Sequence, residues 1–205
     1  MITVEEARRL YSDAEAVHDF DHVLRVLTLA ERIGRAEGAD LDVVRTAVLL
    51  HDIERARGDA TGGDHAQMAA GRARTLLAGA APAFVDAVAH AIHAHRFRNE
   101  VTPQSLEAMV VFDADKLDAI GAVGIARAYA FGGLHGQRLW ADDVPPDYDG
   151  RTLTGEHTPR HEWLYKLSKL KARLYTRTGR AIAEERHRFM EAFFGRMAEE
   201  VAGRA

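Results

Sequence analysis

His51 and Asp52 end an apolar run with helical spacing, 43–50, and these two residue types side by side are strong metal ligands. Burying them at the inner end of an apolar helix costs free energy unless something pairs with them. His22 lies upstream on a second helical pattern, and Asp115 lies downstream on a third. Two imidazoles and two carboxylates from three helices suit a borderline-hard divalent ion. Such a site can leave positions open for water and substrate, as hydrolysis requires.

Further motifs extend the pattern along the chain. They occupy 18–26, 49–53, 112–122, 124–128, 166–171 and 184–190. With these motifs in this order, nearly the whole chain resembles the HD-domain metal-dependent phosphohydrolases, in particular their small stand-alone bacterial branch. The resemblance implies an all-α fold and makes His22, His51, Asp52 and Asp115 metal ligands, with Asp52 able to bridge to a second ion. Asp115 is preferred to Asp113 because it matches the family's Ala-Asp position.

Two more histidines fall where related proteins ligate a second metal or contact the phosphate. His65 follows a glycine-rich loop at an expected helix start, where backbone amides favour anions, and His95 ends another helix. We expect both in the site as phosphate-binding residues. Lys116, Arg25 and Arg96 are candidate cations for the charge on the phosphoryl oxygens, with Lys116 preferred because it adjoins a ligand. The alternative for each is a solvated polar residue.

A departure from the family pattern leaves the general base open. Many HD hydrolases have a carboxylate four residues after the motif histidine, where this chain has Arg55. Glu54 is one position out of register, so Asp52 and Glu54 are both candidate catalytic residues, beside Lys116. A water activated by the metal is the third option, since a divalent ion lowers the pKa of bound water to about 7. The family's Glu before the late Lys-Leu pair is Tyr165 here, so late-helix substrate contacts are not carried over.

The composition limits the alternatives. Cysteine is absent, which excludes thiolate nucleophiles and thiolate metal sites and leaves His and carboxylate ligands. The net charge of −4 gives no overall cationic field for nucleic acid. No basic-then-apolar leader opens the chain, and no apolar run reaches membrane-spanning length. We expect a cytoplasmic protein with neither a membrane nor a nucleic acid as partner; a homodimer stays open.

Helical periodicity dominates and strand signals are nearly absent, so we expect one all-α domain over 1–205 with about eight to ten helices. Cap and stop signals place helices over 18–37, from Asp40 to His51, from Asp64, from Pro82 to His95, from Thr102-Pro103 past Asp115, and at the C-terminus from Thr158 and Thr178. The residues 57–63 are expected to form a loop because of their Gly and Asp content.

The stretch 132–158 is the longest aperiodic part of the chain and is rich in Gly, Pro and Asp. A stretch of that length within a compact domain is commonly functional or disordered. We expect a lid or rim over the site, in which Trp140 and Tyr148 stack on a base. A surface insertion or an oligomer contact is the alternative.

The resemblance implies a metal-dependent phosphohydrolase that cleaves a phosphomonoester or pyrophosphate bond in a nucleotide or another small phosphorylated metabolite. The cofactor is one or two divalent ions, with Mn preferred to Mg, Co, Ni, Fe and Zn. One alternative is an HD-fold di-iron oxygenase, whose ligand set adds histidines in the regions of His65 and His95. The other is a catalytically silent module that binds a nucleotide or nucleic acid through basic late helices; the complete ligand set argues against it.

Overall fold

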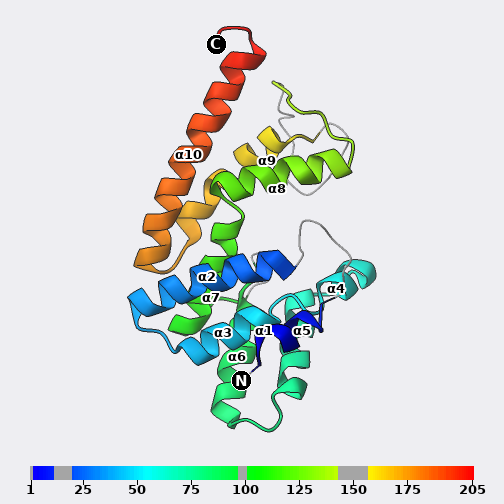
Figure 1. Cartoon of the computed structure of the whole chain (residues 1–205), viewed down its shortest axis with the longest axis vertical. Coiled ribbons are helices and arrows are strands. Elements are labelled where there is room, and N and C mark those ends of the chain that lie inside the picture. Colours follow the sequence, from blue (N-terminus) through cyan, green and yellow to red (C-terminus); the bar gives the residue numbers. More distant parts are fainter. Residues whose placement is uncertain (1, 12–19, 97–100, 143–156) are drawn as a thin grey trace. The chain divides into compact units, whose positions relative to one another are not determined.

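The computed structural model describes residues 2–11, 20–96, 101–142 and 157–205. Within these ranges all regular structure is helical, with ten α-helices and one 3-10 helix (Figure 1). The predicted all-α class and the expected number of helices are confirmed. None of the helices in this part of the chain is long and apolar enough to cross a membrane.

The helices divide into two compact units. One comprises Met1–Asp115 and Leu174–Gly179, and the other Lys116–Arg173 and Arg180–Ala205. The single domain over 1–205 stays a prediction. With the exception of Lys116, every residue assigned to the site from the sequence lies in the first unit.

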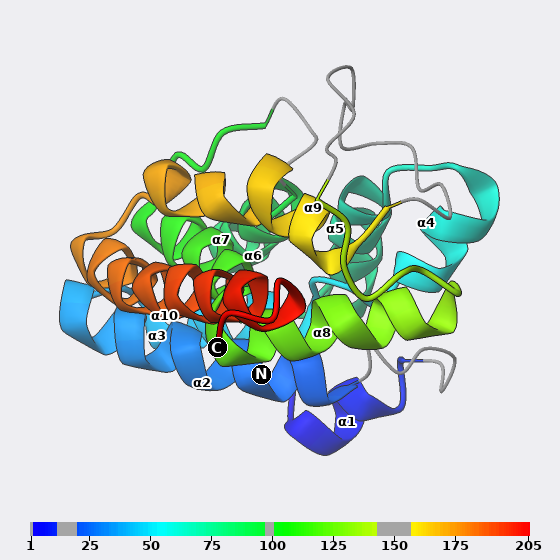
Figure 2. The ribbon, with the colours of Figure 1, turned by 90° about the horizontal axis from the view of Figure 1, so that it is seen from above.

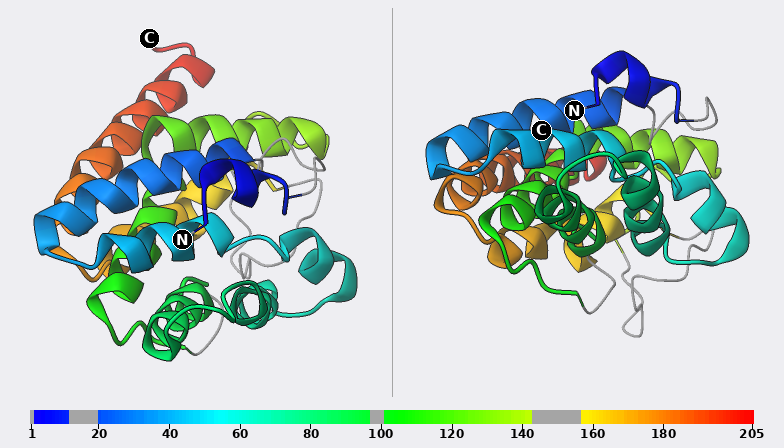
Figure 3. Two further views of the ribbon diagram at one scale, coloured as in Figure 1. Left: turned by 60° about the horizontal axis from the view of Figure 1, so that its bottom comes forward. Right: turned by 90° about the horizontal axis from the view of Figure 1, so that it is seen from below.

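The first unit is built around α3. Its helices are α1 (Val4–Arg8), α2 (Phe20–Glu37), α3 (Leu41–Leu50), α4 (Arg55–Thr61), α5 (His65–Leu76), α6 (Pro82–Ala94) and all but the end of α7 (Leu106–Asp118). The α3 helix packs against α2 and α6, and α6 packs against α5. Figure 2 shows α2 and α3 running alongside each other, and the left view of Figure 3 shows α5 and α6 nearly end-on.

Local sequence explains where α3 begins and what it buries. The Asp40 carboxylate accepts hydrogen bonds from the backbone N–H groups of Asp42 and Val43, which have no partner inside the helix. Most of the helix is buried, as its apolar run predicts. Because both faces are covered, the residues at its far end, His51 and Asp52, are carried into the interior.

The second unit contains α8 (Gly121–Leu134), α9 (Pro159–Tyr165), a 3-10 helix (Leu167–Arg173) and α10 (Arg177–Val201), whose first turn belongs to the first unit. Thr158 caps α9 as predicted. The single helix expected after it is instead a short α-helix followed by the 3-10 helix. Leu167 and Leu170 are buried three residues apart, which is the 3-10 repeat, whereas Leu164 is 38% exposed.

Two other predictions of local structure are wrong. Most of the expected loop over 57–63 belongs to α4. Gly62, which ends the helix with φ 70°, has the left-handed backbone conformation that favours glycine, whereas the residues before it are helical. The helix expected from Thr102-Pro103 begins at Leu106, where the Ser105 hydroxyl accepts from the backbone N–H of Ala108. Ser105 therefore provides the N-cap that was predicted at Thr102.

Candidate metal centre

The ends of five helices bring six potential ligands together in the first unit. They are His22 near the start of α2, His51 and Asp52 at the end of α3, His65 at the start of α5, His95 at the end of α6, and Asp115 in the last turn of α7. The four histidines and Asp52 are all buried. These are the four predicted metal ligands together with the two further histidines predicted from the sequence.

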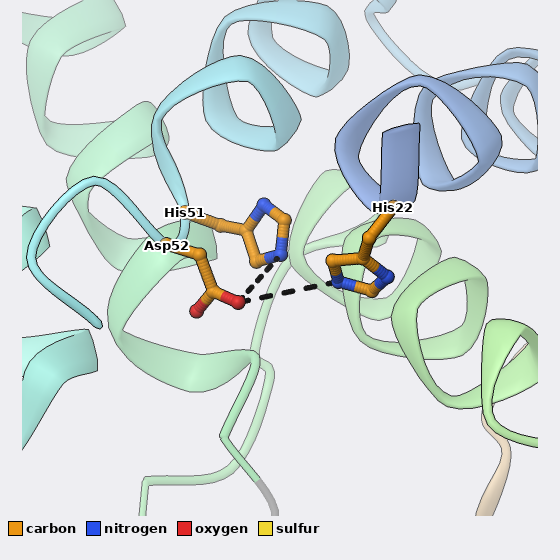
Figure 4. A group of neighbouring side chains, drawn as sticks. All are labelled: His22, His51 and Asp52. Carbon is orange, nitrogen blue, oxygen red and sulfur yellow. Dashed lines mark ion pairs between the residues drawn. The ribbon is translucent and has the colours of Figure 1, made fainter. Parts of the chain in front are cut away.

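The Asp52 carboxylate lies between two pairs of imidazoles and faces each pair with one oxygen. Its Oδ2 is 3.6 Å from Nε2 of His51 and 4.0 Å from Nε2 of His22. Its Oδ1 is 3.5 Å from Nε2 of His65 and 3.6 Å from Nε2 of His95. Figure 4 shows the first of these groups, with His22 reaching in from α2 and all three side chains pointing toward one another.

Asp115 extends the first group, because its Oδ1 is 3.4 Å from Nε2 of His22. The spacing fits metal coordination. With metal–ligand bonds of about 2.0–2.2 Å, neighbouring ligand atoms around one ion lie roughly 3–3.6 Å apart. The side chains therefore form two candidate sets that share Asp52, one with His22 and His51 and one with His65 and His95. Asp115 adjoins the first set at His22.

Hydrogen bonds to backbone carbonyls orient two of the imidazoles. Nδ1 of His51 lies 2.7 Å from the carbonyl oxygen of Val48, and Nδ1 of His95 lies 2.6 Å from that of Ile92. Since a carbonyl only accepts, each Nδ1 carries the proton and donates it. A neutral ring then presents an unprotonated Nε2 toward Asp52, which is the tautomer that binds a metal.

Among the residues that the structure describes, Nε2 of His51, Nε2 of His65 and Oδ1 of Asp52 are buried without a hydrogen-bond partner. A lone pair on nitrogen facing a carboxylate oxygen is repulsive, and buried polar atoms without partners are costly. A cation among these atoms removes both penalties. The residues present therefore fit a divalent ion.

The electrostatics hold these groups in the protonation states that ligation needs. Burial lowers the pKa of His51 from 6.5 to about 4 and that of His65 to about 4 as well. Burial alone would raise the pKa of Asp52, but His51, His95 and Arg55 hold it well below its usual value. At neutral pH the centre thus combines the neutral imidazoles of His51 and His65 with the ionised carboxylate of Asp52.

The other predicted site residues have different surroundings. Arg25 is half-buried and lies three residues after His22, on the same face of α2. Glu54 is buried, and its carboxylate pairs with Arg57 at 3.5 Å and Arg72 at 3.6 Å. Lys116 is half-buried and directly follows Asp115 in α7. The roles assigned to these residues stay predictions.

Trp140, expected in the lid, is buried in the second unit. Its ring N–H donates to Asp142 at 2.9 Å, and the guanidinium of Arg160 lies over the ring at 4.8 Å. The ring is therefore covered by the chain itself. Tyr148 and the rest of 143–156 lie outside the described residues, so the lid stays a prediction.

One contact at the centre was not anticipated from the sequence. Nη1 of Arg55 lies 3.4 Å from Oδ2 of Asp52, the oxygen that also faces His22 and His51. Position 55 was noted in the sequence only because an arginine stands there where a carboxylate was expected. Its approach to Asp52 depends on the turn between α3 and α4, for which the sequence carries no periodic signal.

The comparisons with known proteins agree with this geometry. The family model of the HD domain matches residues 19–120. The protein YpgQ of Bacillus subtilis is 36% identical over 200 residues, which cover 95% of this chain and 89% of that protein. The crystal structure of Bacillus subtilis YpgQ in complex with ADP matches with a TM-score of 0.75 and 32% identity, covering 99% of this chain and 100% of the other.

A second solved structure, an HD-superfamily hydrolase from Bacillus thuringiensis, has a TM-score of 0.75 and 27% identity. The match covers 97% of this chain and 94% of that one. Both structural matches extend well beyond the HD-domain segment, so they include both compact units of the chain.

Proposed function

The chain belongs to the HD-domain family, and from that premise we propose that it is a metal-dependent phosphohydrolase acting on a nucleotide or another small phosphorylated metabolite. The reaction would cleave a phosphomonoester or pyrophosphate bond with water. The observation that carries this proposal is the Asp52 carboxylate, which faces four imidazole nitrogens at 3.5–4.0 Å in a buried centre.

The two oxygens of Asp52 support a centre for two ions. The first ion would be held by His22, His51, Asp52 and Asp115, and the second by Asp52, His65 and His95. A divalent ion bound there supplies Lewis acidity and an activated water. Imidazole and carboxylate ligands with no thiolate suit Mn²⁺ as well as Fe²⁺, Co²⁺, Ni²⁺ and Zn²⁺, and Mn²⁺ is the ion to be tried first.

The protein's own contribution is to fix these ligands before the substrate arrives. The carbonyls of Val48 and Ile92 set the ring orientation of His51 and His95, so these two imidazoles do not have to reorient during the reaction. Asp52 and Asp115 provide two negative charges, and Asp52 is a candidate to accept a proton from the attacking water. Glu54 is a weaker candidate, because two arginines engage its carboxylate.

A nucleotide is the preferred substrate class. The related YpgQ, which matches over the whole chain, has been crystallised with ADP. That complex supports a site for a purine nucleotide with a pyrophosphate bond. The nucleotides to be tried first are therefore ADP, ATP and their deoxy counterparts.

The test is reconstitution without oxygen. Protein stripped with a chelator should recover phosphate or pyrophosphate release from nucleotides when Mn²⁺, Co²⁺ or Ni²⁺ is added anaerobically, since no step changes an oxidation state. The Asp52→Ala protein, treated identically, is the control and should stay inactive.

The same experiment separates the alternatives. The second set, Asp52, His65 and His95, is also what a di-iron oxygenase would need. Turnover that requires both iron and oxygen would support that enzyme. Tight nucleotide binding without turnover under any metal would support a silent binding module. Either result would overturn the proposal that the protein is a phosphohydrolase.

A further inference from the structure

We propose that Arg55 is the residue that binds the phosphoryl group at this centre, and that its charge weakens metal binding at the same time. The inference rests on the proposed function, because it names the cation with which that site meets its anionic substrate.

The first support is the placement of the guanidinium. Arg55 is the first residue of α4, and its Nη1 reaches to 3.4 Å from Oδ2 of Asp52. Its side chain is 30% exposed, so the group touches the metal ligand on one edge and solvent on the other. A phosphoryl group bound to an ion at Oδ2 would lie within reach of the same guanidinium.

The second support is that Arg55 has unused donors. A guanidinium carries five N–H groups in a planar fork suited to two phosphate oxygens. The contact with Asp52 is long for an ionic hydrogen bond, and the nearest oxygen of Asp59 is 3.7 Å from Nε. Nε is buried without a hydrogen-bond partner among the described residues. Most of the binding capacity of Arg55 is therefore available to a ligand.

Three other arginines of the first unit already pair with carboxylates. Arg96 donates to Asp64 at 2.9 Å, and Arg57 and Arg72 both pair with Glu54. The centre carries the negative charges of Asp52 and Asp115, which repel a phosphate dianion. A fixed cation beside the ion offsets that repulsion and acts on the charge that develops in the transition state.

The experiment measures two equilibria on the full chain, neither of which needs turnover. One is the affinity of the Mn²⁺-loaded protein for inorganic phosphate, and the other is the affinity of the metal-free protein for Mn²⁺, both by calorimetry. The variants are Arg55→Gln, which removes the charge, and Arg55→Lys, which keeps the charge but loses the fork. Arg74→Gln is the matched control, since Arg74 pairs with the exposed Asp86 on the surface.

Arg55→Gln should weaken phosphate binding by about tenfold or more, the value of a lost charge-assisted hydrogen bond. It should tighten Mn²⁺ binding by about threefold, because a like charge near the ion is gone. Arg55→Lys should keep the wild-type Mn²⁺ affinity and recover part of the phosphate affinity. Arg74→Gln should change neither.

A weaker phosphate affinity together with a tighter Mn²⁺ affinity cannot come from a disturbed fold, because a disturbed fold would weaken both. Unchanged phosphate affinity in Arg55→Gln, a loss of both affinities, or a wild-type protein that binds no phosphate would each overturn the inference. If phosphate binding depends on Arg55 but the wild type hydrolyses no nucleotide, the proposed function fails and the role of Arg55 stands.

Discussion

Asp64 and Arg96 form an ion pair at 2.9 Å, and each is the direct neighbour of a histidine that faces Oδ1 of Asp52. Asp64 also caps α5 by accepting from the backbone N–H of Ala66. The pair therefore joins the start of α5, which carries His65, to the end of α6, which carries His95. We infer that it sets the distance between these two imidazoles.

Removing that pair should affect the second ion selectively. Arg96→Gln should weaken binding of the second ion by about tenfold, the low end of the cost of losing a group that orients metal ligands, and leave the first ion bound. The free energy of unfolding should fall by no more than about 1 kcal/mol, since both side chains are partly exposed. The measurement is the Mn²⁺ stoichiometry by elemental analysis over a range of free metal. An affinity for the second ion equal to that of the wild type would contradict this role.

The two carboxylates that we propose as ligands, Asp52 and Asp115, should differ in how much metal binding their removal abolishes. Asp52 faces all four imidazoles, whereas the nearest of them to Asp115 is His22. Asp52→Ala should abolish binding of both ions, and Asp115→Ala should abolish one. Hydrolysis should fall by more than about 100-fold in each, while helical circular dichroism is retained.

The check is metal content, together with the rise in melting temperature that Mn²⁺ produces. Wild type should show the largest rise, Asp115→Ala a smaller one and Asp52→Ala none. Full activity in either variant would remove this site assignment.

Asp113, two residues before Asp115, should prove structural. Its Oδ1 accepts from the backbone N–H of Tyr175 at 2.9 Å, and its Oδ2 accepts from the N–H and hydroxyl of Thr176 at 2.7 Å each. The side chain is fully buried. Asp113→Ala leaves these donors without their acceptor, so the free energy of unfolding should fall by about 3–5 kcal/mol.

Denaturant unfolding of metal-free Asp113→Ala and Asp115→Ala measures the free energy of unfolding of each variant, which is compared with that of the wild type. Asp115→Ala, whose side chain is 14% exposed, should change stability little. Equal destabilisation by the two substitutions would show that Asp113 is not the structural one of the pair.

The four candidate ligands could be proposed from the sequence because their chemistry conflicts with their apolar setting. A His-Asp pair at the inner end of an apolar helix needs a partner, and the resemblance identified where His22 and Asp115 stand. The helices that carry them have clear periodicity and caps, such as Asp40 before α3. Such local signals predict the helices correctly because the apolar residues that give the periodicity are the ones that the fold buries.

What could not be predicted depends on how separate segments approach each other. The division of the Asp52 oxygens between two pairs of imidazoles follows from the packing of α5 against α6. The contact of Arg55 with Asp52 follows from the turn that joins α3 to α4. In both cases the partners lie on different elements, and neither composition nor periodicity specifies their geometry.

The last prediction concerns pH. Burial lowers the pKa of His51 and His65 to about 4, whereas in the unfolded chain both titrate near 6.5. Between these values the unfolded chain binds protons that the folded chain does not. The stability of the metal-free protein should therefore be fully present above about pH 7 and fall as the pH drops from 6.5 toward 4, by on the order of 3 kcal/mol per histidine.

Urea unfolding of metal-free protein between pH 4.5 and 7.5 measures this dependence, and His65→Asn should reduce its slope. His135→Asn is the control, because His135 is exposed on α8's C-terminal end, outside the metal centre, and the slope should be retained. Mn²⁺ should steepen the fall in wild type, since the ion binds only the neutral imidazoles and is released as they are protonated. A wild-type stability that is constant across this range would show that these histidines are not held neutral by burial.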